Sequence, residues 1–396
     1  MRIQKRRFFS SLMLLMFSSL FISSYAFSQP GSDAGGNTQP GCEPQRPRAG
    51  YAEYAALIAG IRAPRSPLAP FESRPVWTEF EKYFDRNWAR YDRIQLTPMR
   101  RWASRELSKA VSSGLTVFYP FSGPDFMSAY TLFPNADTYI LMALEPVGKV
   151  PDFQAMSPED FDSFFVNVRK LLHEIIDIDY FISSHMHTGM EGKYLDGVLP
   201  FLLFSMAREK TRILDVKHWF MGTDGTIREA SALDNCDPGP KGAIPGIRIL
   251  FEGPGSTGNK PRTLYYFRLN LYNSSFRRNR HFINFLENFG PFITLMKSAA
   301  YVMSKPQASA ARQFVLDHSR HVLQEDSGIP LKYFNSSVWT LQFHGAYSGP
   351  ISSFPEAYQA DLARIYETGS GIKPLPFGIG YHFLVDTANL LHAARK

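Results

Sequence analysis

Two apolar runs separated by a short helical segment constrain the fold more than any other feature of this chain. Residues 115–121 (LTVFYPF) and 138–143 (TYILMA) have the composition of buried strands, and residues 125–133 have the spacing of a short helix. Strands that are apolar on both faces are typical of parallel sheets covered by helices, and a helical crossover joins parallel neighbours. We therefore predict that these two strands lie side by side and parallel in an α/β fold.

The remaining pattern extends this fold class. A Gly- and Pro-rich connection at 253–262 lies between two strand-like segments and favours an antiparallel hairpin. The prediction is an α/β fold with a mostly parallel sheet flanked by helices and an antiparallel hairpin extension. Helices are expected at 76–91, 98–113, 197–208, 279–289, 292–303, 308–324 and 354–367, with another starting at Ser157, and further strands at 212–220, 246–252, 263–272 and 338–346.

The first 28 residues have the order of a cleavable signal peptide. Four basic residues occupy the first seven positions, an apolar stretch follows from Phe8 to Phe27, and the small residues Ser24 and Ala26 precede a candidate cleavage point. The alternative, an uncleaved anchor, needs about 20 predominantly apolar residues, whereas serines interrupt this stretch. We expect export to the periplasm or beyond, with no permanent membrane span after cleavage.

Beyond the signal, the chain divides into a leader and one folded part. Residues 29–50 are rich in Gly, Pro and Gln and predict a flexible leader. No comparable linker interrupts residues 51–396, which we interpret as a single globular domain, with two tightly joined lobes as the alternative.

Removal of the signal changes the charge of the chain. The segment holds four of the 43 Lys and Arg residues and none of the 36 Asp and Glu residues, so the net charge of +7 falls to +3. A mature protein that is only mildly basic, without a large cationic cluster, does not have the charge pattern of a nucleic-acid-binding protein. We therefore expect no nucleic-acid partner.

Cys42 and Cys236 are the two cysteines of the chain, and both lie in loop-like sequence. An exported protein folds in an oxidising compartment, where a Cys42–Cys236 disulfide would join the leader to a surface loop. Two free thiols remain the alternative.

The most promising polar residues follow the two apolar strands. Ser122, Gly123 and Asp125 come directly after residues 115–121, and Glu145 follows residues 138–143. In open α/β sheets, ligands bind beyond the carboxyl ends of the strands, where helix N-termini present free N–H groups. We interpret these four residues as a ligand site for a small polar, polyol-like molecule. The alternative is structural: Ser122 or Asp125 caps the helix, Gly123 makes the turn, and Glu145 ends a strand.

Residues 115–145 resemble the first β-α-β unit of class I methyltransferases. The segment Pro120-Phe121-Ser122-Gly123 is similar to the loop of the DNA methyltransferases, and Glu145 stands where that family has an acidic residue that holds ribose hydroxyls. Tyr119 and Asp125 depart from the family loop, which has an acid and a glycine there. The segments FYPFSGPD, PNADTYILMALEP and EDSGIP also resemble exported bacterial proteins of an uncharacterised family, a resemblance that implies no chemistry.

His185 and His187 form a second candidate site. On a strand, residues i and i+2 share a face, and two imidazoles with a carboxylate suit Zn²⁺. No spaced third ligand completes a known zinc motif, so we expect neither a metal nor a cofactor, and keep a metal-dependent hydrolase as an alternative. A further alternative is a non-catalytic envelope protein that binds a partner or a glycan through an aromatic surface.

Overall fold

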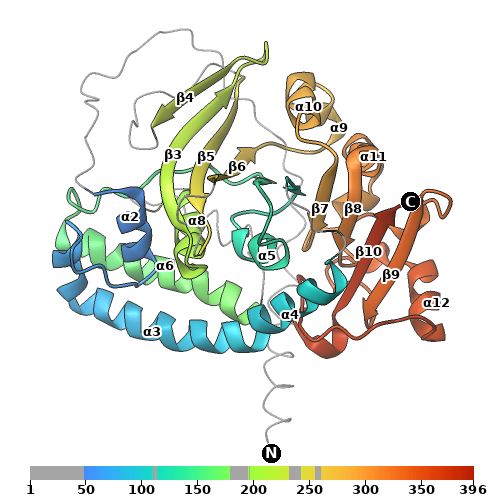
Figure 1. The fold of residues 1–396 in the computed structure, drawn as a ribbon, viewed down its shortest axis with the longest axis horizontal. Helices are drawn as coiled ribbons and strands as arrows, with labels where there is room; N and C mark the ends of the chain where they lie inside the picture. Colours follow the sequence, from blue (N-terminus) through green and yellow to red (C-terminus); the bar gives the residue numbers. More distant parts are fainter. Residues whose placement is uncertain are drawn as a thin grey trace, which may run out of the picture.

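The computed structural model of the chain describes residues 49–108, 110, 114–178, 195, 197–231, 242–254 and 260–396. A ten-stranded sheet with the order β4-β3-β5-β6-β2-β1-β7-β8-β10-β9 runs through these residues (Figure 1). Its strands are β1 (Thr116–Tyr119), β2 (Thr138–Ala143), β3 (Arg212–Met221), β4 (Ile227–Ser231), β5 (Ile244–Glu252), β6 (Arg262–Arg268), β7 (Phe292–Met296), β8 (Ser319–Gln324), β9 (Trp339–Gly345) and β10 (Asn389–Arg395).

The five central strands, β6, β2, β1, β7 and β8, are parallel to one another. The predicted pairing of β1 with β2 is confirmed, with Val117 opposite Tyr139. β5 and β6 form the predicted antiparallel hairpin around the connection at 253–262. The prediction of a mostly parallel sheet was wrong, because antiparallel strands extend the parallel centre on both sides. Five of the nine strand pairings among the described residues are antiparallel.

Two segments predicted as helices each contain a strand. Residues 292–303 contain β7 instead of a helix, and the predicted helix at 308–324 ends at His318, after which β8 begins. Every residue of β7 is buried, so its sequence shows no alternation between a buried and an exposed face. A short continuous apolar run fits a buried helix as well as a buried strand, and here pairing with β1 and β8 decides the outcome.

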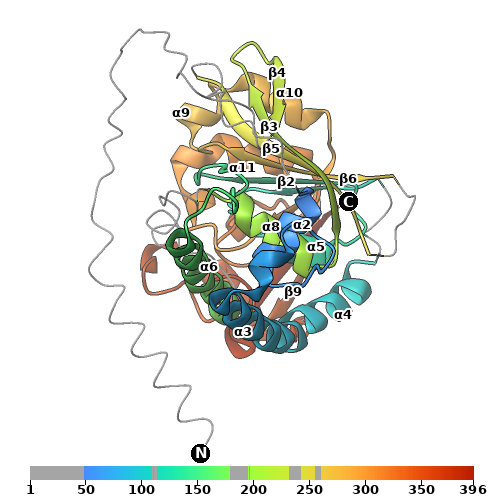
Figure 2. The same cartoon turned by 90° about the vertical axis from the view of Figure 1, so that its left-hand side faces the viewer.

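Helices cover both faces of the sheet. Figure 2 shows α2, α3, α5, α6 and α8 on one side of the strands and α9, α10 and α11 on the other. Among the described residues, no helix is both long enough and apolar enough to cross a membrane. The helices are α2 (Tyr51–Ile58), α3 (Pro75–Tyr91), α4 (Thr97–Glu106), α5 (Phe126–Leu132), α6 (Pro158–Ile178), α8 (Leu199–Arg208), α9 (Asn273–Phe276), α10 (Arg280–Glu287), α11 (Ser309–His318) and α12 (Ala360–Thr368).

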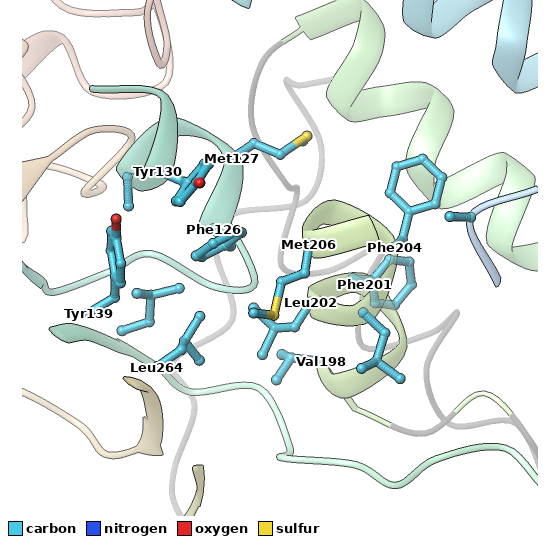
Figure 3. Packing of buried hydrophobic residues seen from close by; sticks show 14 of the residues in the cluster. Phe126, Met127, Tyr130, Tyr139, Val198, Phe201, Leu202, Phe204, Met206 and Leu264 are labelled. Carbon is cyan, nitrogen blue, oxygen red and sulfur yellow. The ribbon is translucent and has the colours of Figure 1, made fainter. Parts of the chain in front are cut away.

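Each face of the sheet has its own hydrophobic core. Val117 and Tyr119 of β1 pack into one core, whereas Phe118 packs into the other, as the alternation of side chains along a strand requires. Figure 3 shows the first core between α5, α8 and the sheet, where Phe126 lies close to Leu202. Burial on both faces explains why β1 and β2 consist almost entirely of apolar residues.

Candidate functional site

The carboxyl ends of the five parallel strands lie at one side of the sheet, which we call the carboxyl edge. β2 and β6, which follow β1 in the chain, lie on one side of β1 in the sheet, whereas the later strands β7 and β8 lie on its other side. The order therefore reverses between β1 and β7, where the connections leaving the two strands diverge. In open α/β sheets this reversal creates a crevice in which ligands bind.

The backbone is strained on both sides of this reversal. Phe121, just after β1, has a φ of 64°, and Ser298, Ala300 and Tyr301, just after β7, have φ values of 50°, 47° and 51°. Residues with a side chain adopt this left-handed conformation at a cost, and such residues cluster at functional sites where the surrounding structure holds them. The positive φ values are thus a second indication, besides the strand order, of a functional site at the carboxyl edge.

Ser122 joins the end of β1 to β2. Its N–H donates to the carbonyl of Met142 over 2.9 Å, and its Oγ accepts from the Met142 N–H over 3.0 Å. The same Oγ lies 3.0 Å from the carbonyl oxygen of Gly123, and Gly123 has a φ of 53°, as a turn glycine does. Both residues therefore shape the loop, and their role in binding a ligand remains a prediction.

Asp125 caps α5 and binds a buried lysine. Its Oδ1 accepts from the N–H of Ser128 over 3.0 Å, and its Oδ2 accepts from the Tyr119 hydroxyl over 2.9 Å. The Nζ of Lys297 lies 3.0 Å from the same Oδ2 and donates to the Ser128 Oγ over 2.8 Å. The structure thus shows the helix cap that was the alternative to a ligand role for Asp125. Lys297 matches its negative charge, a contact that the sequence did not predict.

Glu145 lies two residues beyond β2 with only 5% of its surface exposed. Its main-chain carbonyl accepts from the Tyr266 hydroxyl over 2.9 Å. Its Oε2 is buried and has no hydrogen-bond partner among the described residues. Within that part of the chain, no hydrogen bond or ion pair links Glu145 to Asp125. The carboxyl edge therefore contains a buried carboxylate oxygen that still needs a donor.

The loop after Glu145 is held by a close approach of two backbones. The N–H of Val198 donates to the carbonyl of Pro146 over 3.0 Å. A Cβ on Gly197 would lie 2.3 Å from the nitrogen of Gly148, so only glycine fits at position 197. This contact fixes the loop against the start of α8 and with it the position of Glu145.

A second acidic cluster lies beyond β8. Glu325 and Asp326 follow the strand directly, and His382 comes from a loop before β10; all three are buried. One ligand atom from each lies within 4.8 Å of the others. The Nε2 of His382 is 2.9 Å from Oδ1 of Asp326, but it lies off the direction in which a ring N–H would donate, so it has no satisfactory hydrogen bond among the described residues.

Neutral donors orient Asp326. The Tyr301 hydroxyl donates to its Oδ2 over 3.0 Å, and the Asn389 Nδ2 donates to its Oδ1 over 3.0 Å. Burial alone would raise the pKa of Asp326, but its contacts with His382 and Asn389 lower it. The carboxyl group is therefore held in one orientation and in its charged form.

The pKa of Glu325 is shifted in the opposite direction to that of Asp326. The Ser298 N–H donates to its Oε1 over 2.8 Å, and the Ser327 hydroxyl also donates to this oxygen. Its Oε2 is buried without a partner among the described residues. Burial and the charge of Asp326 raise the pKa of Glu325 well above its ordinary value. The two adjacent carboxyl groups thus differ in protonation, as expected when two acids share a site with few counter-charges.

A groove lined by three tyrosines lies next to this cluster. Tyr347, Tyr358 and Tyr366 border a cavity of about 540 Å³ near α12. The Gln359 N–H donates to the Tyr347 hydroxyl over 3.1 Å, and its Nε2 donates to the Asp326 carbonyl over 3.0 Å. Gln359 therefore connects the groove to the residues beyond β8.

The other predicted residues cannot be placed on this framework. His185, His187, Cys42 and Cys236 lie outside the described residues. The Glu325–Asp326 pair was missed because residues 308–324 had the pattern of one helix, in which Asp326 and Gly328 resembled a helix end. The signal available in the sequence was the apolar pair Val322-Leu323 near the end of a strand, with an acidic pair after Gln324 and a glycine at position 328.

Comparison with known proteins adds no functional information. A scan against family models, a search of curated proteins and a search of solved structures gave no match to this chain. Its class is therefore described by the fold: an α/β protein with a mixed ten-stranded sheet and a polar carboxyl edge.

Proposed function

We propose that this protein binds a neutral ligand with neighbouring hydroxyl groups at the carboxyl edge, beside Ser122, Asp125 and Glu145. The observation that carries the proposal is the buried Oε2 of Glu145, which lacks a hydrogen-bond donor among the described residues. A buried carboxylate oxygen without a donor is costly, and a ligand hydroxyl would supply the missing hydrogen bond. The ligand is a polyol, or the ribose of a nucleoside.

The strand order supports this position for the ligand. Numbered along the chain, the parallel strands lie in the order 3-2-1-4-5, as do the first five strands of doubly wound nucleotide-binding folds. In those folds a carboxylate associated with the second strand binds the ribose hydroxyls. Glu145 follows the second strand here, in agreement with the resemblance of residues 115–145 to the methyltransferase unit.

The charges favour a neutral ligand over an anion. Lys297 offsets Asp125, and Glu145 has no salt bridge among the described residues. The three side chains together leave a net negative charge, which would repel a phosphate despite the nearby N-terminus of α5. A hydroxylated ligand needs no compensating charge.

Calorimetric titration of the mature protein tests the proposal. One set of ligands consists of free sugars and sugar alcohols, another of uncharged nucleosides, and inorganic phosphate is the anionic comparison. We expect binding from one hydroxylated set, and at least a tenfold loss of affinity in Glu145→Gln, because the amide accepts hydroxyl hydrogen bonds more weakly than a carboxylate. Glu229→Gln, on the edge strand β4, is the matched control and should bind as the wild type does.

Two results would overturn the proposal. One is an affinity that Glu145→Gln leaves unchanged, and the other is the absence of binding in both hydroxylated sets. Circular dichroism and thermal unfolding of the variants separate a loss of binding from a loss of folding.

A second function, glycan binding by an envelope protein, is favoured by the tyrosine groove. Tyr347 and Tyr358 have ring centroids 6.1 Å apart, and Tyr358 is 56% exposed. Large rings with a polar group suit the apolar faces and hydroxyls of sugars. Tyr358→Ala should abolish retention on immobilised envelope polysaccharide if this function is correct. Tyr265→Ala, on β6 and six strands away from β9 in the sheet order, serves only to reveal effects of general destabilisation.

A further inference from the structure

The three side chains beyond β8 contain polar atoms that the described residues leave without hydrogen bonds. The exposed fractions of Glu325, Asp326 and His382 are 1%, 3% and 7%. Oε2 of Glu325, Nε2 of His382 and Oγ of Ser298 are all buried without a satisfactory partner in this part of the chain. Native proteins rarely bury such atoms, and three in one cluster indicate that something else binds there.

Gly380 and His382, from one loop, pack against these groups. A Cβ on Gly380 would lie 3.1 Å from Oγ of Ser298 and 3.2 Å from Cδ of Glu325, so Gly380 covers both groups. His382, two residues further, places its Nε2 2.9 Å from Oδ1 of Asp326. The loop that carries Gly380 and His382 therefore lies directly against the acidic pair.

The cluster combines two carboxyl groups with a single basic side chain, that of His382. Among the described residues, neither Glu325 nor Asp326 forms a salt bridge with a lysine or an arginine. The donors to Asp326 from Tyr301 and Asn389 are neutral. Carboxylates in a low-dielectric interior are costly unless they are paired or bind a metal.

We propose that Glu325, Asp326 and His382 bind one divalent first-row metal ion. Two carboxylates and an imidazole are ligands that Zn²⁺ accepts, whereas Ca²⁺ and Mg²⁺ prefer oxygen alone. Ligands about 2.0–2.2 Å from such an ion lie roughly 3–3.5 Å from one another. The three ligand atoms lie within 4.8 Å of one another, and metal binding would draw them together to this separation.

Neighbouring groups already orient two of the ligands. Tyr301 and Asn389 hold the carboxyl group of Asp326, and the N–H of Ser298 holds that of Glu325. Hydrogen bonds of this kind commonly fix metal ligands in place. Ser298 and Tyr301, two of these donors, both have positive φ values, of 50° and 51°. This proposal departs from the sequence-based expectation that the chain holds no metal.

Zn²⁺ alone is the probe for the test. The mature protein is treated with a chelator, dialysed, titrated with ZnCl₂ in a calorimeter, and then passed through a desalting column for elemental analysis. We expect one Zn²⁺ per chain and a higher unfolding temperature with Zn²⁺. His382→Gln and Glu325→Gln should each reduce the affinity at least tenfold, and Gly380→Ala should weaken it by crowding the side chain of Glu325 while keeping all three ligands.

Two matched controls locate the ion. His344→Gln changes another buried histidine outside the cluster, and His185→Ala/His187→Ala removes the second candidate site in the sequence; both should bind Zn²⁺ as the wild type does. The proposal is overturned if the wild type binds no Zn²⁺. It is also overturned if folded His382→Gln and Glu325→Gln both retain wild-type affinity. The same holds if His185→Ala/His187→Ala is the only variant that loses the ion. If the two ligand variants do not fold, the affinity of folded Gly380→Ala decides: wild-type affinity there rejects the site.

Discussion

Nζ of Lys297 lies 3.0 Å from Oδ2 of Asp125, and both side chains are buried at the point where the strand order of the sheet reverses. The pair connects the ends of β1 and β7, which are far apart in the sequence and adjacent in the sheet. Its position means that the charge balance of the carboxyl edge depends on one contact between two distant segments.

Removing one member of this pair should destabilise the fold. Lys297→Met leaves the carboxylate of Asp125 buried without its counter-charge, and we expect the free energy of unfolding to fall by about 3–5 kcal/mol. Lys297→Met/Asp125→Asn should recover much of this loss, because asparagine still caps α5 and no charge remains buried. Urea denaturation of the two variants measures both effects.

Lys217→Met is the matched control for this comparison. Lys217 pairs with Glu229 over 3.4 Å, but its side chain is 40% exposed. Exposed pairs contribute less than about 1 kcal/mol, so the control should remain close to the wild type. Equal losses in Lys297→Met and Lys217→Met would contradict the assigned role of the buried pair.

Gly197→Ala should be among the most destabilising glycine substitutions in the chain. A Cβ there would lie 2.3 Å from the nitrogen of Gly148, at a φ of 69°. Because the backbone at Gly148 would have to move, we expect the free energy of unfolding to fall by at least about 2 kcal/mol. Gly369→Ala, with a φ of 63° and nothing within 4 Å, should lose only about 1 kcal/mol from its conformation. Thermal unfolding of both variants distinguishes steric crowding from strain alone.

The sequence predicts the β1–α5–β2 unit well because both faces of its strands are buried. A run such as residues 138–143 has no polar alternation, and its flanking turns limit it to strand length. Parallel pairing then brings the carboxyl ends to one edge, which is why the sequence alone predicts that Asp125 and Glu145 lie there.

The residues beyond β7 and β8 were not accessible by the same reasoning. Phe292–Met296 has the same composition as a buried helix, and its identity as a strand depends on hydrogen bonds to β1 and β8. His382 joins the acidic pair from a loop before β10, a strand that was not predicted. No local pattern contains such long-range contacts, so Lys297 and the Glu325–Asp326–His382 cluster required the structure.

Export is a prediction that mass measurement can test directly. Given the basic start, the apolar stretch and the small residues at Ser24 and Ala26, we propose cleavage near Ala26–Phe27 or Ser28–Gln29. The intact mass of protein recovered from the periplasm or medium should match a chain beginning at Phe27 or Gln29. Recovery of a chain that still begins at Met1 would reject it.

We also propose that Cys42 and Cys236 form a disulfide in the exported protein. An oxidising compartment favours the bond, which would close a long loop and restrict the unfolded chain. Peptide mapping without reductant should recover the linked peptides, and Cys42→Ser/Cys236→Ser should unfold at a lower temperature. Two thiols that react with an alkylating agent in the freshly isolated native protein would reject the bond.

Buried histidines should make the fold sensitive to mild acid. His344 on β9 and His392 on β10 are buried, and burial lowers the pKa of each to about 4. Neighbouring charges adjust these values: Glu106 raises both, whereas Lys373 lowers both, and His321 lowers the pKa of His392. The folded protein therefore keeps both imidazoles neutral at pH values where an unfolded chain protonates them.

The direction of the effect follows from which state binds more protons. Between about pH 6.5 and pH 4 the unfolded chain binds more protons, so the free energy of unfolding falls as the pH falls through this window and levels off below it. Each histidine contributes up to about 3 kcal/mol to this loss. Above pH 6.5 both states hold neutral histidines and the contribution vanishes.

His344→Asn isolates this contribution from those of other acids. The Trp102 Nε1 lies 3.3 Å from Nδ1 of His344, and the Oδ1 of asparagine can accept the same hydrogen bond without titrating. The free energy of unfolding, measured by urea denaturation at several pH values from 7.5 to 4, should fall less steeply in the variant than in the wild type. The difference should grow from pH 6.5 to pH 4, because only the unfolded wild-type chain gains a proton at position 344 in this range. Parallel curves for the two proteins would show that His344 titrates alike in the folded and unfolded chain, and would contradict its burial as the cause.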